Sequence, residues 1–130
     1  MCGILVYIGE NKLDKGHKSL EVIDHRGPDN SGVQCFEINN LFLTLGHKRL
    51  SIIDLSDQAS QPMLFQGTKL WVTYNGEIYN YLELKNELIN HGYKFQTNSD
   101  TEVLIAAYHY WGSECLNRLN GMFAFCIWDE

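Results

Sequence analysis

The chain has 130 residues and a mass of 15.0 kDa, a length typical of a single globular domain. Hydrophobic residues make up 45% of the chain and charged residues 20%, which is ordinary for a folded domain and argues against intrinsic disorder. The formal net charge is −6 and the sequence contains no basic run, so nucleic-acid binding is not indicated.

The chain carries no targeting or membrane-spanning pattern. Its longest apolar stretches, residues 4–8 and 122–128, are far shorter than the ~20 residues of a membrane-spanning helix. The N-terminus lacks the pattern of a secretory signal peptide. Four cysteines without a Cys-x-x-Cys pair exclude the common zinc spacings and argue against a dense disulfide framework. These features predict a cytoplasmic protein.

The first part of the chain predicts a strand and a helix. Residues 3–9 are β-branched and aromatic with almost no polar interruption, which predicts a strand buried on both faces. Residues 14–24 carry a weak amphipathic pattern that predicts a short helix. This helix is expected to end before residues 26–29, where Gly and Pro favour a turn.

The middle of the chain predicts further strands. Residues 32–38 and 41–45 are two apolar runs separated by Asn-Asn at residues 39–40, a pair that suits a tight hairpin. Residues 57–61 are polar and precede a proline, which predicts an irregular loop. Residues 70–74 predict another strand.

Two helices and a last strand are predicted in the remainder. Asn80, with a glutamate three residues later, starts a helix that ends at residues 91–92. Ser99 has the same spacing and starts a second helix that ends before Gly112. Residues 122–128 predict a strand that is apolar on both faces. Because its neighbours in a sheet are expected to follow it, this strand predicts an incomplete domain.

Cys2 is the residue with the most suggestive chemistry. Removal of Met1 would make it the first residue and place a thiol beside a free α-amine. An amine and a thiol both titrate near neutral pH, so one residue would supply the nucleophile and its base. The alternative interpretation is a buried cysteine that acts as a small hydrophobe at the start of a strand.

The Asn75-Gly76 pair has two interpretations that are compatible. Asn-Gly between apolar residues is a strong signal for a hairpin turn. Alternatively, the absence of a side chain at Gly76 lets its backbone N–H approach a ligand, while the Asn75 amide offers a second donor. Two such donors are what a developing oxyanion requires.

Two charged residues are candidates for binding a small zwitterion. The guanidinium of Arg49 is suited to capturing a carboxylate through two hydrogen bonds, although a surface arginine on an edge strand would have the same sequence. Asp100 could meet an ammonium group, although residues 99–102 are explained more simply by a helix N-terminus that satisfies its own backbone donors.

Several short segments, given below, occur in one order along the chain, and their combination is specific to one protein family. The chain closely resembles the N-terminal glutaminase domain of glutamine-hydrolysing asparagine synthetase, a class II glutamine amidotransferase of the N-terminal-nucleophile hydrolase superfamily. The resemblance covers essentially all 130 residues. Its segments are Cys2-Gly3-Ile4, His25-Arg26-Gly27-Pro28-Asp29, residues 46–54, Gln61-Pro62-Met63, residues 74–80, residues 99–102 and residues 119–125. Pro28 favours this subfamily, since sugar-amidating relatives more often resemble Arg-Gly-Tyr-Asp at that place.

The resemblance implies an α+β fold, a four-layer αββα sandwich, and a glutaminase reaction. It implies that Cys2, with its own α-amine as base, attacks the side-chain amide of glutamine to form a thioester and release ammonia, after which water frees glutamate. The implied oxyanion hole consists of Asn75 and the Gly76 N–H. The implied contacts to glutamine are Arg49 with the α-carboxylate, and Glu77 and Asp100 with the α-ammonium.

The same resemblance implies partners outside these residues. A domain spanning residues 2–130 would be truncated on its C-terminal side, because the family's domain continues into further strands. The C-terminal synthetase domain, which uses ATP and Mg to make asparagine from aspartate and ammonia, is absent here, and no cofactor is expected for this chain. A homodimer is one assembly that the resemblance allows for the parent enzyme.

Other functions remain open from the sequence. The chain could be a catalytically silent fragment that binds glutamine or a partner domain, or the glutaminase domain of another class II amidotransferase. A third hypothesis is a thiol enzyme that uses His47 as its base, which would be active with Met1 retained.

Overall fold

The computed structural model describes residues 2–11, 17–50 and 57–130. Met1, the first part of the helix predicted at residues 14–24 and the end of the segment at residues 46–54 lie outside the described residues.

Sheet A contains three antiparallel strands, β1 (Gly3–Gly9), β2 (Asn30–Ile38) and β3 (Leu41–Arg49), in the order β1-β3-β2. The hairpin predicted between β2 and β3 is confirmed, and both strands are longer than expected. Asn39 has φ 56° at the turn, a backbone conformation that asparagine adopts more readily than most residues.

Sheet B is also antiparallel and contains β4 (Met63–Leu64), β5 (Leu70–Ile78) and β6 (Gly121–Asp129), in that order. The predicted strand at residues 122–128 is confirmed as part of β6. The predicted strand at residues 70–74 is confirmed as the first part of β5, which continues for four more residues and carries the Asn-Gly pair.

Three α-helices and several 3₁₀ turns complete the described chain. Among the described residues, the helix predicted at residues 14–24 corresponds to the short α1, which ends at Glu21. The two longer helices are confirmed as α2 and α3. The α-helices are α1 (His17–Glu21), α2 (Tyr81–Asn90) and α3 (Asp100–Trp111), and the 3₁₀ turns are Asp24–Arg26, Asp57–Ala59 and Gly112–Arg118.

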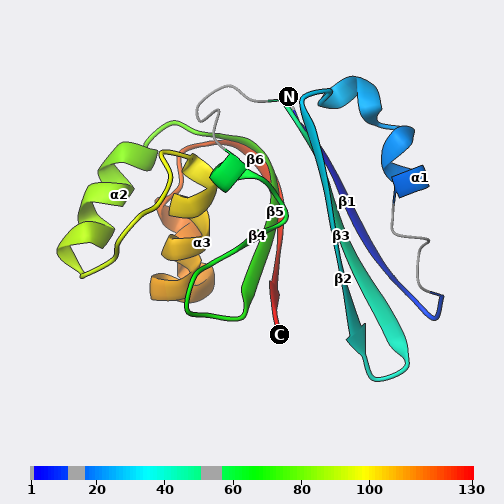
Figure 1. Cartoon of the computed structure of the whole chain (residues 1–130). Helices are drawn as coiled ribbons and strands as arrows, with labels where there is room; N and C mark the ends of the chain where they lie inside the picture. Colours follow the sequence, from blue (N-terminus) through cyan, green and yellow to red (C-terminus); the bar gives the residue numbers. More distant parts are fainter. Residues whose placement is uncertain (1, 12–16, 51–56) are drawn as a thin grey trace.

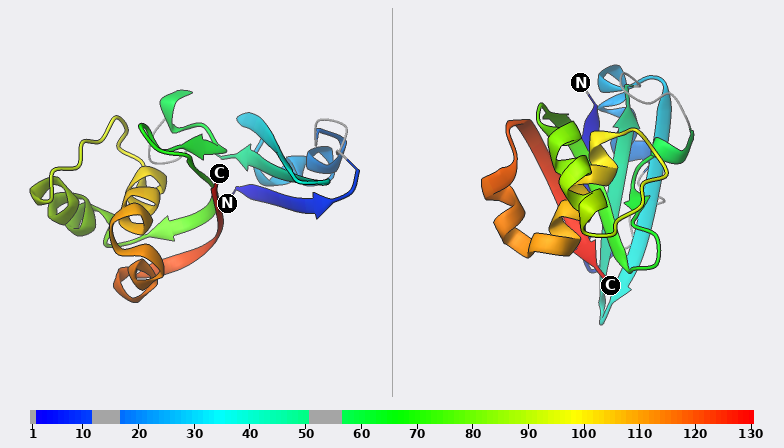
Figure 2. Two further views of the ribbon diagram at one scale, coloured as in Figure 1. Left: turned by 90° about the horizontal axis from the view of Figure 1, so that it is seen from below. Right: turned by 90° about the vertical axis from the view of Figure 1, so that its left-hand side faces the viewer.

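These elements form four layers. Figure 1 shows sheets A and B face to face, with α1 outside sheet A and with α2 and α3 outside sheet B. Figure 2 shows the same arrangement from two further directions. The α+β fold with αββα layering is therefore confirmed.

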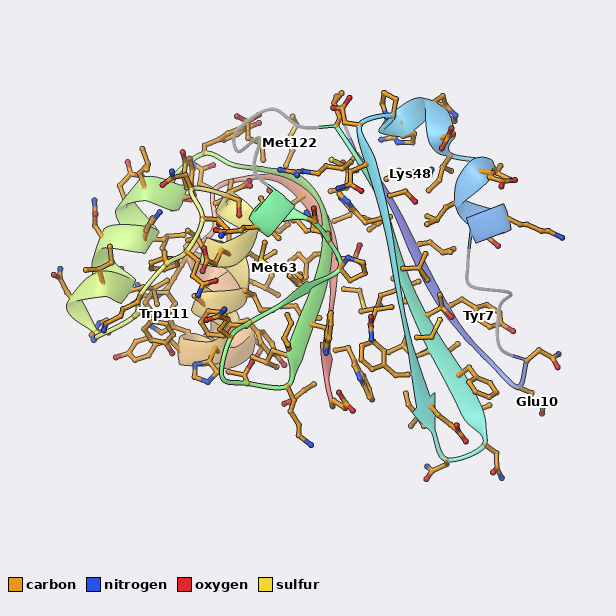
Figure 3. The ribbon with its side chains drawn as sticks, in the orientation of Figure 1. Tyr7, Glu10, Lys48, Met63, Trp111 and Met122 are labelled. Atoms are coloured by element: carbon orange, nitrogen blue, oxygen red, sulfur yellow. The ribbon has the colours of Figure 1, made fainter. Side chains whose placement is uncertain are left out.

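The core has two parts. The larger lies between sheet B and the helices, and the smaller lies between the two sheets. Figure 3 shows side chains of both sheets filling the space between them, while Tyr7 and Lys48 lie on the far side of sheet A. The smaller core consists of Phe36, Leu43 and Leu45, with Ile38, Trp71, Cys126 and Trp128 packed against them.

The prediction that β1 is buried on both faces is wrong. β1 is an outer strand of sheet A, and its register with β3 places Val6 and Ile8 on the face directed toward sheet B. These side chains are 43% and 62% exposed, so sheet B does not bury them. An apolar run indicates a strand but not how many elements cover it.

Candidate active site

The N-terminal segment is held against the end of β3. Gly3 pairs with Lys48 in the antiparallel register, so Cys2 lies beside the last residues of β3. Its half-buried thiol accepts a hydrogen bond from the Leu50 backbone N–H at 3.3 Å. Arg26 Nε donates to the Cys2 carbonyl at 3.1 Å. Main-chain and side-chain contacts thus fix the thiol at one end of the sandwich.

Arg49 lies on the central strand of sheet A and not on a sheet edge. Alternation along β3 places its side chain on the same face as Leu45 and His47, which is the face directed toward sheet B. Arg49 is only 7% exposed. The interpretation of Arg49 as a surface residue on an edge strand is therefore wrong, and a buried guanidinium points between the sheets.

The Asn75-Gly76 pair lies within β5, so the hairpin-turn interpretation is wrong. Asn75 is opposite Ala124 and Gly76 is opposite Phe123 in the register with β6. A Cβ atom at Gly76 would meet the Met122 carbonyl oxygen and would lie 2.6 Å from the Phe123 Cα. Glycine is required here by the close approach of a neighbouring strand, not by a turn.

Beyond Val72, where pairing with β4 stops, side chains cover one edge of β5. The two residues of β4 pair with Trp71 and Val72 only. Two residues further on, the Tyr74 N–H donates to Gln61 Oε1 at 2.6 Å, and the Tyr74 carbonyl lies 3.1 Å from His47 Nε2. Side chains therefore occupy the places that a neighbouring strand would otherwise fill.

The next backbone donor on this edge is the N–H of Gly76. In an antiparallel strand the N–H groups of every second residue point to the same edge. The N–H groups of Tyr74 and Ile78 both point away from β6, and Ile78 donates to Asp100 Oδ2 at 3.1 Å. Gly76, which lies between them, therefore directs its N–H to the same open edge.

Asn75 supplies a polar side chain on the face directed toward sheet A. Thr73, two residues earlier, faces the same way and donates to the Gly46 carbonyl at 3.0 Å. The Asn75 Oδ1 atom is buried and has no hydrogen-bond partner in the described part of the chain. Glu77 follows on the same face and is exposed. A buried polar atom without a partner marks a place where a ligand can bind.

Asp100 lies at the start of α3 and is tied to β5. Its Oδ2 atom accepts a hydrogen bond from the Tyr74 hydroxyl at 2.6 Å, besides that from Ile78. The pKa of Tyr74 is raised by burial, by this hydrogen bond, and by the negative charges of Asp100, Glu77 and Cys2. The charges of the three acidic groups therefore reach one phenol, which places Cys2, Glu77 and Asp100 around the same region.

The helix interpretation of residues 99–102 is also correct. The Ser99 side chain accepts a hydrogen bond from the Glu102 N–H, as a helix N-cap does. The cap and the contact with β5 are compatible, because Ser99 makes the first and Asp100 the second.

His47 is buried and uncharged. Burial lowers its pKa to about 4, and the nearby charge of Arg49 acts in the same direction. A carbonyl oxygen can only accept, so Nε2 carries the hydrogen that is shared with the Tyr74 carbonyl. This geometry favours a structural link between the sheets over a base for Cys2.

Sequence reasoning did not assign the roles of Arg26, Gln61 and Tyr74, and it considered His47 only as an alternative base for the thiol. Arg26 and Gln61 lie in segments that carried the resemblance, which was the only signal available for them. Their contacts join residues that are distant in the chain, so no local pattern predicts them.

A known protein family matches the whole chain. A model of the glutamine amidotransferase domain matches residues 1–130. The chain belongs to the glutamine amidotransferase domain family.

Relatives of this glutamine amidotransferase domain are much longer proteins. The chain is 39% identical over 137 residues to glutamine-hydrolyzing asparagine synthetase 1 of Bacillus subtilis (strain 168), covering 100% of the chain and 21% of that protein. It is 42% identical over 134 residues to glutamine-hydrolyzing asparagine synthetase 2 of Oryza sativa subsp. japonica, covering 99% and 22%. The chain therefore spans about a fifth of the length of these relatives.

A solved structure of an amidotransferase shares the fold of the domain. A glutamine phosphoribosylpyrophosphate amidotransferase from Bacillus subtilis, solved with ADP and GMP, matches with a TM-score of 0.57 and 32% identity. The match covers 67% of this chain and 21% of that one.

Two kinds of feature are absent from the described residues. No helix in residues 2–11, 17–50 and 57–130 is long and apolar enough to cross a membrane. Within the same ranges, no group of three or more His, Cys, Asp or Glu side chains is arranged to hold a metal ion.

Proposed function

We propose that this amidotransferase domain hydrolyses glutamine to glutamate and ammonia through a thioester on Cys2. The observation that carries the proposal is the open edge of β5. There, β4 does not pair with Gly76, whose N–H faces the uncovered edge, and the neighbouring Asn75 amide has a buried Oδ1 atom without a partner in the described chain. The charge of Cys2 acts on the adjacent Tyr74, so the thiol lies in the same region. The Gly76 N–H and the Asn75 Nδ2 group would be the two donors that acyl transfer to the thiol requires.

In the proposed mechanism Cys2 acts as the first residue, after removal of Met1. Its α-amine takes the thiol proton while the sulfur attacks the side-chain amide carbon of glutamine. The negative charge that forms on the amide oxygen is stabilised by the Gly76 N–H and the Asn75 amide. The intermediate collapses by expelling ammonia, which receives a proton from the α-ammonium. Water then attacks the thioester, which frees glutamate and restores the thiol.

The zwitterionic end of glutamine requires charges of both signs. Arg49, buried on the inner face of β3, would bind the α-carboxylate. Asp100 uses Oδ2 for Tyr74 and Ile78, so its Oδ1 atom would meet the α-ammonium, together with the exposed Glu77. The site would thus offer one cation to the α-carboxylate and two carboxylates to the α-ammonium of a free amino acid.

We further propose that the ammonia serves asparagine synthesis in a longer cytoplasmic protein. The support is the similarity to glutamine-hydrolyzing asparagine synthetases, of which this chain spans about a fifth. A C-terminal synthetase domain would be the partner and would bind ATP and Mg, and the glutaminase step needs no cofactor in this chain. Residues 2–130 would form only part of the family's complete glutaminase domain, and the parent could be a homodimer.

The decisive experiment measures glutamate and ammonia release from glutamine by protein whose N-terminus is verified by mass spectrometry. We expect turnover when Cys2 is the first residue. We expect a loss of about a thousandfold or more in Cys2→Ala, because the nucleophile is removed.

Protein that retains Met1 is expected to be inactive, since its Cys2 has no free α-amine. Activity with Met1 retained would instead support a base such as His47. Calorimetric glutamine binding without turnover, in folded protein that begins at Cys2, would support a silent binding module and contradict the proposal.

A further inference from the structure

Gln61 links three elements around the proposed site. It precedes β4 by two residues and is 8% exposed. Its Oε1 atom accepts from the Tyr74 N–H at 2.6 Å, and its Nε2 atom donates to Thr101 Oγ1 at 3.2 Å. Both ends of the side-chain amide are therefore used inside the protein.

The position of Gln61 keeps one part of β5 open. If the residues before Met63 also formed a strand, their backbone would cover the edge of β5 beyond Val72, including the Gly76 N–H. A side-chain carbonyl instead satisfies the Tyr74 N–H at a single point. The next donor on the edge then stays available to a ligand while the backbone before it is held in place.

Gln61 also joins the two halves of the proposed site. Thr101 follows Asp100 in the first turn of α3, and the Tyr74 hydroxyl donates to Asp100. Gln61, Tyr74, Asp100 and Thr101 therefore form a closed ring of contacts. The ring connects the strand that carries the proposed oxyanion donors to the helix that carries the proposed ammonium ligand.

We propose, on the basis of the proposed function, that Gln61 is a positioning residue that sets the geometry of the oxyanion hole formed by Asn75 and Gly76. It touches neither the substrate nor the nucleophile. Its effect is exerted through the backbone N–H of Tyr74, the residue that immediately precedes Asn75. An error of about 1 Å in such a site can reduce the rate by about a hundredfold.

The test compares Gln61→Met, which keeps the size of the side chain but removes its acceptor, with Gln61→Glu, which keeps an acceptor oxygen. The Tyr74 N–H and the Thr101 hydroxyl can both donate to that carboxylate. In Gln61→Met we expect kcat for glutamine hydrolysis to fall about tenfold to a hundredfold, with KM changed less than about threefold. Gln61→Glu should recover most of the loss in kcat. Gln66→Met, at an exposed glutamine, is the matched control and should retain wild-type kinetics.

A second measurement separates positioning from general damage. Iodoacetamide alkylates a thiol by direct displacement and forms no oxyanion, so its rate at Cys2, measured by peptide mass spectrometry, should change less than about twofold in Gln61→Met. If Gln61→Met does not fold, Thr101→Val provides the test, with an expected fall in kcat of about threefold to tenfold and unchanged alkylation.

The outcomes distinguish this inference from the function on which it rests. Wild-type protein that begins at Cys2 but releases no glutamate would overturn the proposed function. Active wild-type protein with unchanged kcat in Gln61→Met, or in Thr101→Val where that variant is used, would overturn the role of Gln61 alone. Loss of alkylation in parallel with kcat would also overturn it, since the effect would then not be specific to the oxyanion.

Discussion

His47 couples the stability of the protein to pH. Its pKa is about 4 in the folded chain, below the ordinary value of 6.5, because burial disfavours the charged ring. As the pH falls below about 6.5, the unfolded chain binds a proton that the folded chain does not bind. The free energy of unfolding should therefore decrease between about pH 6.5 and about pH 4, by about 3 kcal/mol from this residue.

The variant His47→Gln isolates this contribution. Glutamine does not titrate and can still donate to the Tyr74 carbonyl. Urea unfolding at about pH 7 and about pH 5 should show a smaller loss of stability in His47→Gln than in wild type, by about 2 kcal/mol. The other histidines are the same in both proteins. Equal pH dependence would contradict the assignment of a low pKa to His47.

At the level of single residues, the sequence indicated the candidate site residues but not the contacts that hold them in place. Cys2, Arg49 and the Asn75-Gly76 pair stand in ordered segments, so the resemblance could assign their roles. The hydrogen bond between Gln61 and Tyr74 joins residues 13 positions apart, because β4 begins only at Met63 and leaves the Tyr74 N–H to a side chain. No periodic or local pattern encodes such a contact, and only the fold reveals it.

At the level of elements, α2 and α3 carry the same capping spacing in the sequence but begin differently. Ser99 caps α3 through the Glu102 N–H. Asn80 makes no cap hydrogen bond, so the predicted capping box at α2 is wrong. Its side chain instead accepts from the Asn120 N–H and donates to the Arg118 carbonyl, both at 2.9 Å. A tertiary contact has replaced the local one, which the sequence could not indicate.

The cap of α3 predicts a measurable loss of stability. Ser99→Ala removes the acceptor for the Glu102 N–H and should lower the free energy of unfolding by about 0.5–2 kcal/mol, as measured by urea unfolding. Ser113→Ala, at an exposed position in the 3₁₀ turn that follows α3, should change it by less than about 0.5 kcal/mol. Equal effects of the two substitutions would mean that the cap contributes nothing specific.

At the level of the whole molecule, a small aromatic cluster joins the two sheets. The Phe36 ring of sheet A lies 5.5 Å from that of Trp71 and 6.1 Å from that of Trp128, both in sheet B. Phe36→Ala should therefore lower the free energy of unfolding by about 3–5 kcal/mol in urea, since it opens a cavity between the sheets.

Ile8→Ala is the matched comparison for Phe36→Ala. Ile8 lies on the same face of sheet A but is 62% exposed, so its truncation should cost less than about 0.5 kcal/mol. A large loss in Ile8→Ala would show that this side chain is covered in solution, against the described fold.

The order of layers could be predicted for the whole molecule, but the covering of each strand could not. The resemblance implied four layers, and the sequence pattern predicted the longer helices and strands that build them but not β4. Burial of β1 was overestimated, because its apolar residues indicate a strand without indicating what packs on it. Coverage depends on the relative position of the two sheets, which is a property of the assembled fold.

The outer position of β1 has a consequence for concentrated solutions of the protein. Its seven residues, Gly3–Gly9, include neither a charge nor a proline, the two features by which natural edge strands commonly block pairing with another molecule. The free edge of this strand is therefore one place in the described chain where aggregation can begin, and a lysine introduced at Val6 or Ile8 would oppose it there.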